Sequence, residues 1–192
     1  MTYADVVRRI AGRARLVGVI KGRADAEAIP LLRAGLRDVA DNRVDALAAR
    51  QLGPDVRYHF IGNVQSRDVR RLAELKPALV HSFDRVDLAA KWPREVPVLL
   101  QVDFTGRADR NGIAPDALAS ALAHARAHGL DVRGLSTLPP QGEDPRPHFR
   151  RLRELQDQLG LRELSMGMSA DFEVAIEEGA TMVRVGRALF EP

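Results

Sequence analysis

The sequence predicts an α/β protein that folds as a single (β/α)8 barrel of the TIM type. Eight short runs are rich in apolar and β-branched residues, as strands buried on both faces are. Most of these runs are followed by a stretch with helical spacing of apolar residues, and helical connections are typical of a parallel sheet. Eight such units can close into a barrel, and an open doubly wound sheet is the alternative. The 192 residues leave room for one domain, over residues 1–192, with short loops.

The first half of the chain is expected to begin with a helix over residues 2–13 and to continue with four strand–helix units. Asp25, Ser66 and Asp84 are candidate N-caps, because their side chains can accept hydrogen bonds from the free N–H groups of a first helical turn. Pro30 lies deep in the helix that Asp25 begins, which predicts a kink or a later start. The strands are predicted at residues 16–20, 36–42, 56–65 and 78–84, and the helices after them at 25–35, 44–51, 66–75 and 84–91.

The second half of the chain supplies the remaining four strands. Pro115 suits the first turn of a helix, and Gly129 suits its end. Phe149, Leu152 and Leu155 share one face of a later helix, so this face is expected to pack on the sheet. The strands are predicted at residues 96–104, 132–139, 163–169 and 182–190, the last one including its exit, and the helices at 115–128, 147–160 and 171–179.

The composition argues against several classes of protein. The chain has no cysteine, which leaves no disulfide and no thiol chemistry, and it has no His pair at ligand spacing, so no metal site is expected. No apolar run reaches membrane length, and the N-terminus lacks the continuous apolar segment of a secretory signal, so a cytoplasmic protein is expected. The net charge is only +3, and the basic residues are spread among acidic ones, which argues against nucleic-acid binding.

Lys21 ends the first predicted strand. The apolar run over residues 16–20 stops at this lysine, and Gly22 follows it. An ammonium in such a place is costly unless it is paired or has reacted. Two interpretations are open from this segment alone. Lys21 is a strand-end lysine whose ammonium reaches water, or it is kept partly neutral to form a Schiff base with an aldehyde.

Polar and charged residues recur where the other predicted strands end. In a (β/α)8 barrel the active groups lie at the C-terminal ends of the strands, so residues at these ends are expected to surround one site. This recurrence favours a functional role for the lysine. The strand-end residues are Lys21, Asn42, Asn63, Gln65, Asp103, Thr137, Ser169, Arg184 and Gly186.

Arg184 lies in the otherwise apolar run MVRVG, and a buried guanidinium needs an acceptor. The acceptor is either an internal acid, such as Asp41 or Asp103, or a ligand. Small residues of the SMGMSADF segment and Gly186 follow the last two strands, where barrels commonly bind phosphate through backbone N–H groups.

A lysine, a phosphate site and a buried cation together indicate pyridoxal 5′-phosphate. Lys21 would bind the aldehyde, and Arg184 would face the pyridine nitrogen. A protonated arginine can only donate a hydrogen bond. The ring nitrogen must then accept it and stay unprotonated, which makes the cofactor a weak electron sink.

The motifs of the chain also resemble those of a known family. They are, in order, LVGVIK, HFIGNVQS, LVHSFDR, LLQVD, GLSTLPP, LSMGMSADFEVAIEEGATMVRVG and ALF. In sequence and spacing they resemble the pyridoxal-phosphate homeostasis proteins (YggS/PROSC type), single-domain relatives of the alanine racemase N-terminal barrel. The resemblance covers residues 16–190. It implies a covalent bond from the cofactor to Lys21, ring-nitrogen contact by Arg184 and a phosphate site at Ser169 and the backbone of residues 186–187. The cofactor-binding residues that it implies are Lys21, Asn42, Met166, Ser169, Arg184, Gly186 and Arg187.

Two departures from the family pattern bear on cofactor affinity. Arg187 stands where the family usually has Thr or Ser, so a hydroxyl donor to the phosphate is lost. Its guanidinium either adds charge to the phosphate site or points to solvent. Asp68 reverses a charge near the cavity mouth. The sequence does not set the size of either effect.

The residues favour a cofactor carrier over an enzyme, and none is assigned as catalytic. A racemase needs a second acid or base opposite the lysine. Tyr3 and Tyr58 do not follow a catalytic pattern, and His59 and His81 are expected to be hydrogen-bonded inside the barrel. We therefore expect a monomer that holds pyridoxal phosphate and delivers it to apo-enzymes. The alternatives are an amino-acid racemase or transaminase of weak activity and a phosphosugar enzyme in which Lys21 serves another carbonyl.

Overall fold

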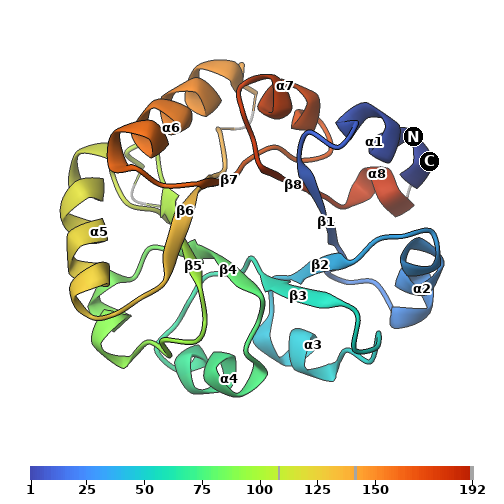
Figure 1. Cartoon of the computed structure of the whole chain (residues 1–192), viewed down its shortest axis with the longest axis horizontal. Helices are drawn as coiled ribbons and strands as arrows, with labels where there is room; N and C mark the ends of the chain where they lie inside the picture. The colour runs from blue at the N-terminus through green and yellow to red at the C-terminus, as the bar shows by residue number, and fades with distance from the viewer. Residues whose placement is uncertain (108, 141, 191–192) are drawn as a thin grey trace.

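Eight parallel strands close into a barrel in the order in which they occur along the chain (Figure 1). The computed structural model describes residues 1–107, 109–140 and 142–190. The barrel closes because β8 pairs with β1, from Arg15–Met182 to Gly18–Val185. The (β/α)8 prediction is thus confirmed, and the open sheet is excluded. The strands are β1 (Arg15–Val19), β2 (Asp38–Asp41), β3 (Arg57–Phe60), β4 (Leu79–Phe83), β5 (Val98–Val102), β6 (Val132–Thr137), β7 (Glu163–Ser165) and β8 (Met182–Val185).

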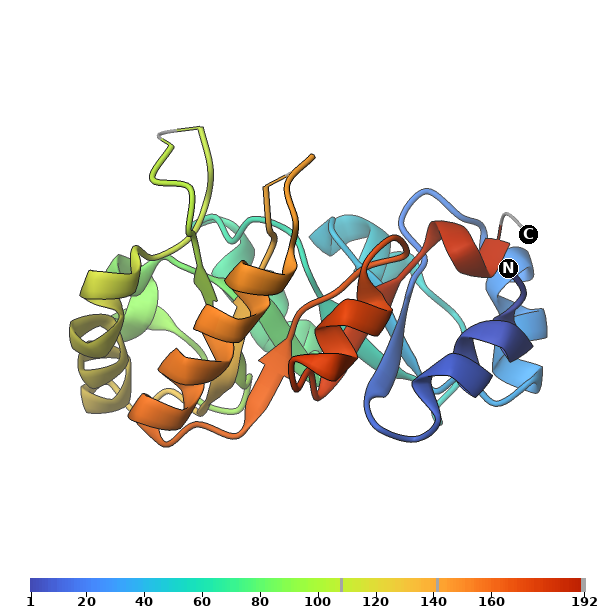
Figure 2. The ribbon, with the colours of Figure 1, turned by 90° about the horizontal axis from the view of Figure 1, so that it is seen from above.

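Helices surround the barrel, and the first and last of them lie side by side (Figures 1 and 2). Figure 2 also shows that the described parts of the loops after β5 and β6 project beyond the other connections. No helix in the described part of the chain is long and apolar enough to cross a membrane. The helices are α1 (Tyr3–Ile10), α2 (Asp25–Arg33), α3 (Val44–Ala49), α4 (Asp68–Leu75), α5 (Leu118–Ala127), α6 (Arg146–Leu159), α7 (Phe172–Glu177) and α8 (Arg187–Phe190), with the 3-10 helices η1 (Val86–Lys91) and η2 (Pro115–Ala117).

The barrel has two apolar cores. Alternate residues of each strand point to opposite faces. One set of strand residues packs against the helices, and its partners include the predicted buried face of α6. The other set fills the barrel interior with Val17, Ala40, Leu79, Leu99 and Met182. The interior row of β1 runs from Val17 to Val19, and its next member is Lys21, which explains why this side chain reaches the barrel mouth.

Several predicted element ends are wrong. Ala24, Arg67 and Arg85 occupy the N-cap positions that were assigned to Asp25, Ser66 and Asp84. The helix with Pro30 starts at Asp25 and continues past the proline.

The predicted strands over residues 56–65, 163–169 and 182–190 are too long. They end at Phe60, Ser165 and Val185, and the last four described residues form α8 instead. The extra residues leave the sheet because they form the loops around the barrel mouth.

Candidate functional site

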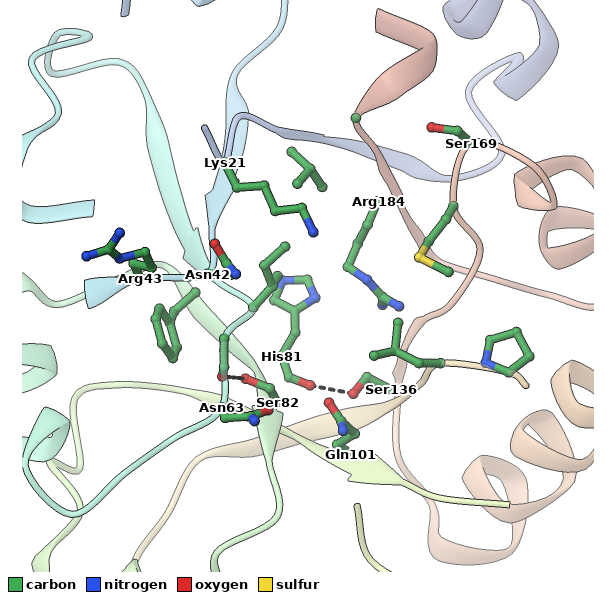
Figure 3. A pocket seen from close by; sticks show the side chains of 18 of the residues that line it. Lys21, Asn42, Arg43, Asn63, His81, Ser82, Gln101, Ser136, Ser169 and Arg184 are labelled. Carbon is green, nitrogen blue, oxygen red and sulfur yellow. Dashed lines mark hydrogen bonds between the residues drawn. The ribbon is translucent and has the colours of Figure 1, made fainter. Parts of the chain in front are cut away.

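A cavity of about 1410 Å³ opens at the C-terminal end of the barrel (Figure 3). It is larger than a typical small-molecule site of roughly 300–1,000 Å³. The ends of both the early and the late strands contribute to its wall, as expected for a (β/α)8 barrel. The sequence-predicted residues that line it are Lys21, Asn42, Asn63, Gln65, Ser169, Arg184, Gly186 and Arg187.

Three sequence-predicted residues do not line this cavity. Met166 is fully buried in the core between barrel and helices, and Met168 lines the cavity in its place. The Thr137 hydroxyl donates to the Val102 carbonyl at 2.8 Å. The Asp103 carboxylate accepts from the backbone of its own loop, at the N–H groups of residues 105 and 106.

Their places are taken by Gln101, Ser136, Ser82 and His81, which sequence reasoning did not assign to the site. Side chains along a strand alternate between its two faces, and this alternation could have predicted two of the four residues. Gln101 continues the interior row from Leu99, and Ser136 is the inward neighbour of Thr137.

The Lys21 side chain points into the cavity, between those of Asn42 and Arg184 (Figure 3). The side chain is exposed rather than buried, and its ammonium pairs with no other described group. The Lys21 amine is therefore open to a ligand that enters the cavity.

Arg50 of the segment after α3 holds the strand end that carries Lys21. Its Nη2 donates to the Ile20 carbonyl at 2.9 Å and to Asp41 Oδ2 at 2.6 Å. Its Nη1 donates to the Arg23 carbonyl at 2.7 Å and to Asp25 Oδ1 at 2.9 Å. Burial lowers the pKa of Arg50, but the two carboxylates outweigh it and raise this pKa overall. The segment 20–23 is thus tied to β2 and α2 by one buried cation.

Asp41 also orients the residue that follows β2. Its Oδ1 accepts from the backbone N–H of Asn42 at 2.8 Å and of Arg43 at 3.3 Å. Asp41 is therefore the partner of Arg50 and of a backbone turn. Asp41 does not pair with Arg184, although this pairing was one of the alternatives left open by the sequence.

Arg184 lies on the cavity floor and is only 6% exposed. Nη1 donates to the Ser165 carbonyl at 2.7 Å and to the Ser165 hydroxyl, and Nη2 donates to the Thr137 carbonyl at 2.9 Å. No carboxylate in the described chain pairs with it, so the internal ion pair is not formed. Burial lowers the pKa of Arg184 to about 10, which leaves it protonated at neutral pH. An unneutralised cation thus faces the cavity.

The turn after β7 and the start of α8 form a candidate anion site. Within the described residues, the backbone N–H groups of Ser169, Ala170 and Arg187 donate to no other group. The Ser169 hydroxyl accepts from the Ala188 N–H at 3.3 Å, which ties the two segments together. Free N–H groups gathered in this way suit a phosphate. The Arg187 side chain lines the cavity beside them.

Two glycines keep this anion site open. Gly167 has φ +89, and a Cβ there would lie 2.5 Å from Ala175 Cβ. A Cβ on Gly186 would lie 3.2 Å from the Val19 carbonyl oxygen. Larger residues would therefore strain the turn or push β8 away from β1.

The histidines and tyrosines offer no free acid or base at the cavity. His59 and His81 are hydrogen-bonded inside the barrel, as the sequence predicted. They bond to each other, with Nδ1 of the first 2.8 Å from Nε2 of the second. Neither Tyr3 nor Tyr58 lines the cavity. The described residues contain no group of three or more His, Cys, Asp or Glu side chains that could hold a metal ion.

Comparisons with known proteins found a matching family model and similar relatives. The family model for the alanine racemase N-terminal domain matches residues 3–191. The pyridoxal phosphate homeostasis protein of Deinococcus radiodurans is 40% identical over 194 residues, which cover 95% of this chain and 91% of the relative. The protein of the same name from Pseudomonas aeruginosa is 38% identical over 220 residues, which cover 98% and 95%.

Solved structures with the same fold include PipY of Synechococcus elongatus. Its structure without PLP has a TM-score of 0.85 at 30% identity, and the match covers 96% of this chain and 99% of PipY. PipY with PLP bound has a TM-score of 0.82 at the same identity. Alanine racemase from Corynebacterium glutamicum, at 20% identity and a TM-score of 0.74, shares the fold over 97% of this chain but only 58% of its own. The chain therefore corresponds to the barrel part of that longer protein.

Proposed function

Because the chain belongs to the alanine racemase N-terminal-domain family, and within it to the pyridoxal phosphate homeostasis proteins, we propose that it holds pyridoxal 5′-phosphate in the barrel cavity as a Schiff base on Lys21. The cofactor predicted from the sequence is confirmed at the level of the family, since PipY is known with PLP bound. We further propose that residues 1–192 form one cofactor-binding domain, and that the protein is a cytoplasmic monomer that delivers the cofactor to apo-enzymes.

One observation carries this proposal, namely the three kinds of group that face a single cavity. The Lys21 amine is free, the Arg184 guanidinium is cationic, and the N–H groups of Ser169, Ala170 and Arg187 are unpaired within the described chain. Pyridoxal phosphate has one matching group for each, which are an aldehyde, a ring nitrogen and a phosphate. When bound, the cofactor supplies an aldehyde carbon that amines attack.

The environment of Arg184 supports a bound cofactor whose ring withdraws electrons only weakly. Its guanidinium is protonated at neutral pH and can only donate a hydrogen bond. A ring nitrogen in contact with it must accept, and so stays unprotonated. Sites that place a carboxylate there favour the protonated ring and withdraw electrons more strongly.

The described cavity wall offers neither a tyrosine nor an unpaired histidine as a second proton-transfer group, which supports a carrier. His81 is the one histidine of the described cavity wall, and both its ring nitrogens are occupied, by His59 at 2.8 Å and by the Ser165 hydroxyl at 2.7 Å. Burial, followed by the charges of His59, Arg184 and Arg15, lowers the pKa of His81 well below its usual value. His81 is therefore a poor acid or base. An amino-acid racemase of weak activity is the second candidate, since the barrel is shared with alanine racemase.

Cofactor attachment is tested by absorbance and mass spectrometry. The purified protein is incubated with pyridoxal phosphate, reduced with borohydride and digested. We expect a yellow complex and a reduced adduct on the peptide with Lys21, both lost in Lys21→Ala and kept in Lys91→Ala, which changes an exposed lysine outside the cavity. A protein that stays colourless at saturating cofactor would refute the proposal.

The carrier and the racemase are separated with the loaded protein. Single enantiomers of amino acids are incubated with it, and their optical purity is followed over time. The carrier proposal expects no loss beyond that caused by free cofactor. Robust loss that depends on the protein would instead identify a racemase.

A further inference from the structure

A row of buried polar side chains crosses the interior of the barrel and ends at Arg184. Asp38 Oδ1 lies 2.9 Å from His59 Nε2, and His59 Nδ1 lies 2.8 Å from His81 Nε2. His81 Nδ1 lies 2.7 Å from the Ser165 hydroxyl, which accepts from Arg184. We call Asp38, His59, His81 and Ser165 the polar row. Each of its members is at most 3% exposed.

The polar row connects two regions of different exposure. At one end, Asp38 accepts two hydrogen bonds from Arg57, at 2.7 and 2.6 Å, and the Arg57 side chain is 54% exposed. At the other end, His81 and Arg184 form part of the cavity floor (Figure 3). His59 lies between the ends and does not line the cavity. The row therefore joins the cavity to the start of β2 and β3.

The charge of Asp38 sets the direction of the first hydrogen bond. Burial raises the pKa of Asp38, but the hydrogen bonds from His59 and Arg57 and the charge of Arg57 outweigh this and bring the pKa to about 2. The carboxylate is therefore ionised at neutral pH and can only accept. His59 must donate to it from Nε2.

The remaining directions follow one by one when both imidazoles are neutral. His59 Nδ1 then has no proton and accepts from His81 Nε2. His81 Nδ1 has no proton either and accepts from the Ser165 hydroxyl, which leaves the lone pairs of Ser165 for Arg184. Each donor of the row meets one acceptor, and all the hydrogen bonds point from Arg184 toward Asp38. Such a chain is mutually polarised, which strengthens its members.

This order fixes the orientation of Arg184. The Ser165 hydroxyl proton is held by His81, so its oxygen is turned toward the guanidinium. Together with the carbonyls of Ser165 and Thr137, it holds two of the guanidinium nitrogens. A buried polar group without a partner is costly, and the four members of the row lie beside apolar interior residues such as Ala40, Leu79 and Met182. Their mutual hydrogen bonds are therefore needed to keep them there.

We propose that His59, His81 and Ser165 are positioning residues that orient Arg184 toward the ring nitrogen of the ligand and transmit occupancy of the cavity to Asp38. This inference rests on the proposed function only for the identity of the ligand. The direction of the hydrogen bonds is a property of the chain itself and can be tested without any ligand.

The first test is nuclear magnetic resonance of the ¹⁵N-labelled histidine side chains in the full chain without cofactor. The chain has five histidines, and single substitutions of His124, His128 and His148 leave the resonances of His59 and His81 identified as a pair. We expect His59 and His81 to carry one proton each, on Nε2. A proton on Nδ1 of either residue at neutral pH would overturn the proposal, and this measurement needs no variant of the row.

The second test adds pyridoxal phosphate to the same sample. We expect the ring resonances of His59 to shift although this residue lies outside the cavity. In Ser165→Ala the shift of His59 should vanish while the cofactor still binds, about tenfold more weakly, because Arg184 loses one of its acceptors. The control is Thr181→Val, which also removes one hydroxyl bonded to the backbone of β7 but leaves the polar row intact. Its His59 should respond as in the unmodified chain.

The outcomes distinguish this inference from the proposed function. A yellow complex without any response of His59, or a response that persists in Ser165→Ala, overturns the inference and leaves cofactor binding in place. A protein that does not bind the cofactor overturns the proposed function. The proton positions of the first test still show in which direction the hydrogen bonds of the polar row point.

Discussion

The guanidinium of Arg50 and the carboxylate of Asp41 meet at 2.6 Å directly behind the strand end that carries Lys21. Asp41 is 1% exposed and the Arg50 side chain 9%, so this pair is almost free of solvent. The same two residues bond the backbone just after β1 and β2, because Arg50 donates to the Ile20 carbonyl and Asp41 accepts from the Asn42 N–H. The position of the predicted cofactor lysine thus depends on an ion pair outside the cavity.

Removing Arg50 is expected to destabilise the protein strongly. Arg50→Ala leaves the Asp41 carboxylate buried without its cation, which costs about 3–5 kcal/mol of unfolding free energy. Urea denaturation followed by circular dichroism measures the loss. Arg70→Ala is the matched control, since Arg70 is paired with Glu74 but its side chain is 93% exposed. Its effect should stay below about 1 kcal/mol, and equal effects of the two variants would contradict the role of Arg50.

Asp38 is expected to make stability depend on pH in the acid range. Its pKa in the folded protein is about 2, below the usual value of 3.8. A depressed acid stabilises the fold above its unfolded pKa, and this contribution is lost as the pH falls from about 4 to about 2. The difference corresponds to about 2 kcal/mol.

Urea unfolding of the protein and of Asp38→Asn, at a series of pH values, measures this contribution. The variant is less stable at neutral pH, but its stability should fall less steeply below pH of about 4, since the titrating group is gone. Asp109→Asn, which changes an exposed acid, should keep the slope of the unmodified chain. A slope in Asp38→Asn as steep as in the unmodified chain would show that other groups cause it.

Arg184→Met is expected to separate stability from cofactor binding. The change removes a buried cation that has no carboxylate partner in the described chain, and a long apolar side chain fills the space. We expect the unfolding free energy to fall by no more than about 3 kcal/mol, because an unpaired buried cation is removed while the carbonyls of Ser165 and Thr137 lose their donor. Affinity for pyridoxal phosphate should fall at least about tenfold, as measured by absorbance titration, because the proposed donor to the ring nitrogen is lost. Unchanged affinity would exclude Arg184 from the binding site.

Arg187 is expected to contribute to affinity through its charge. Its side chain lies at the cavity wall beside the free N–H groups of the anion site. Arg187→Ala should weaken cofactor binding by about threefold to tenfold and reduce its dependence on salt, since an exposed cation near a phosphate is screened.

Titrations at low and high salt test the role of Arg187. Arg151→Ala, on the outer face of α6, is the control and should change neither affinity nor salt dependence. If Arg187→Ala binds as tightly as the unmodified chain at low salt, the guanidinium points to solvent. Arg187→Thr, which restores a hydroxyl, then shows whether a neutral donor adds affinity.

Much of the candidate site could be predicted because it lies at strand ends. Lys21 and Arg184 each interrupt an apolar run, which marks them in the sequence without knowledge of their neighbours. The glycines and serines after the last two strands carry a recognisable pattern of small residues. The prediction went wrong where it depended on which face a residue occupies, as with Thr137 in place of Ser136 and Met166 in place of Met168.

The sequence by itself determined the eight strands, their parallel direction and the kinds of side chain at the strand ends, because apolar runs and their ends are local features. Only the tertiary structure decided which groups bond to one another. Ser165 and His81 are 84 residues apart in the chain, and Arg50 and Ile20 are 30 apart. Their contacts depend on barrel closure and on the register between strands, which bring side chains together in pairs that no local pattern records.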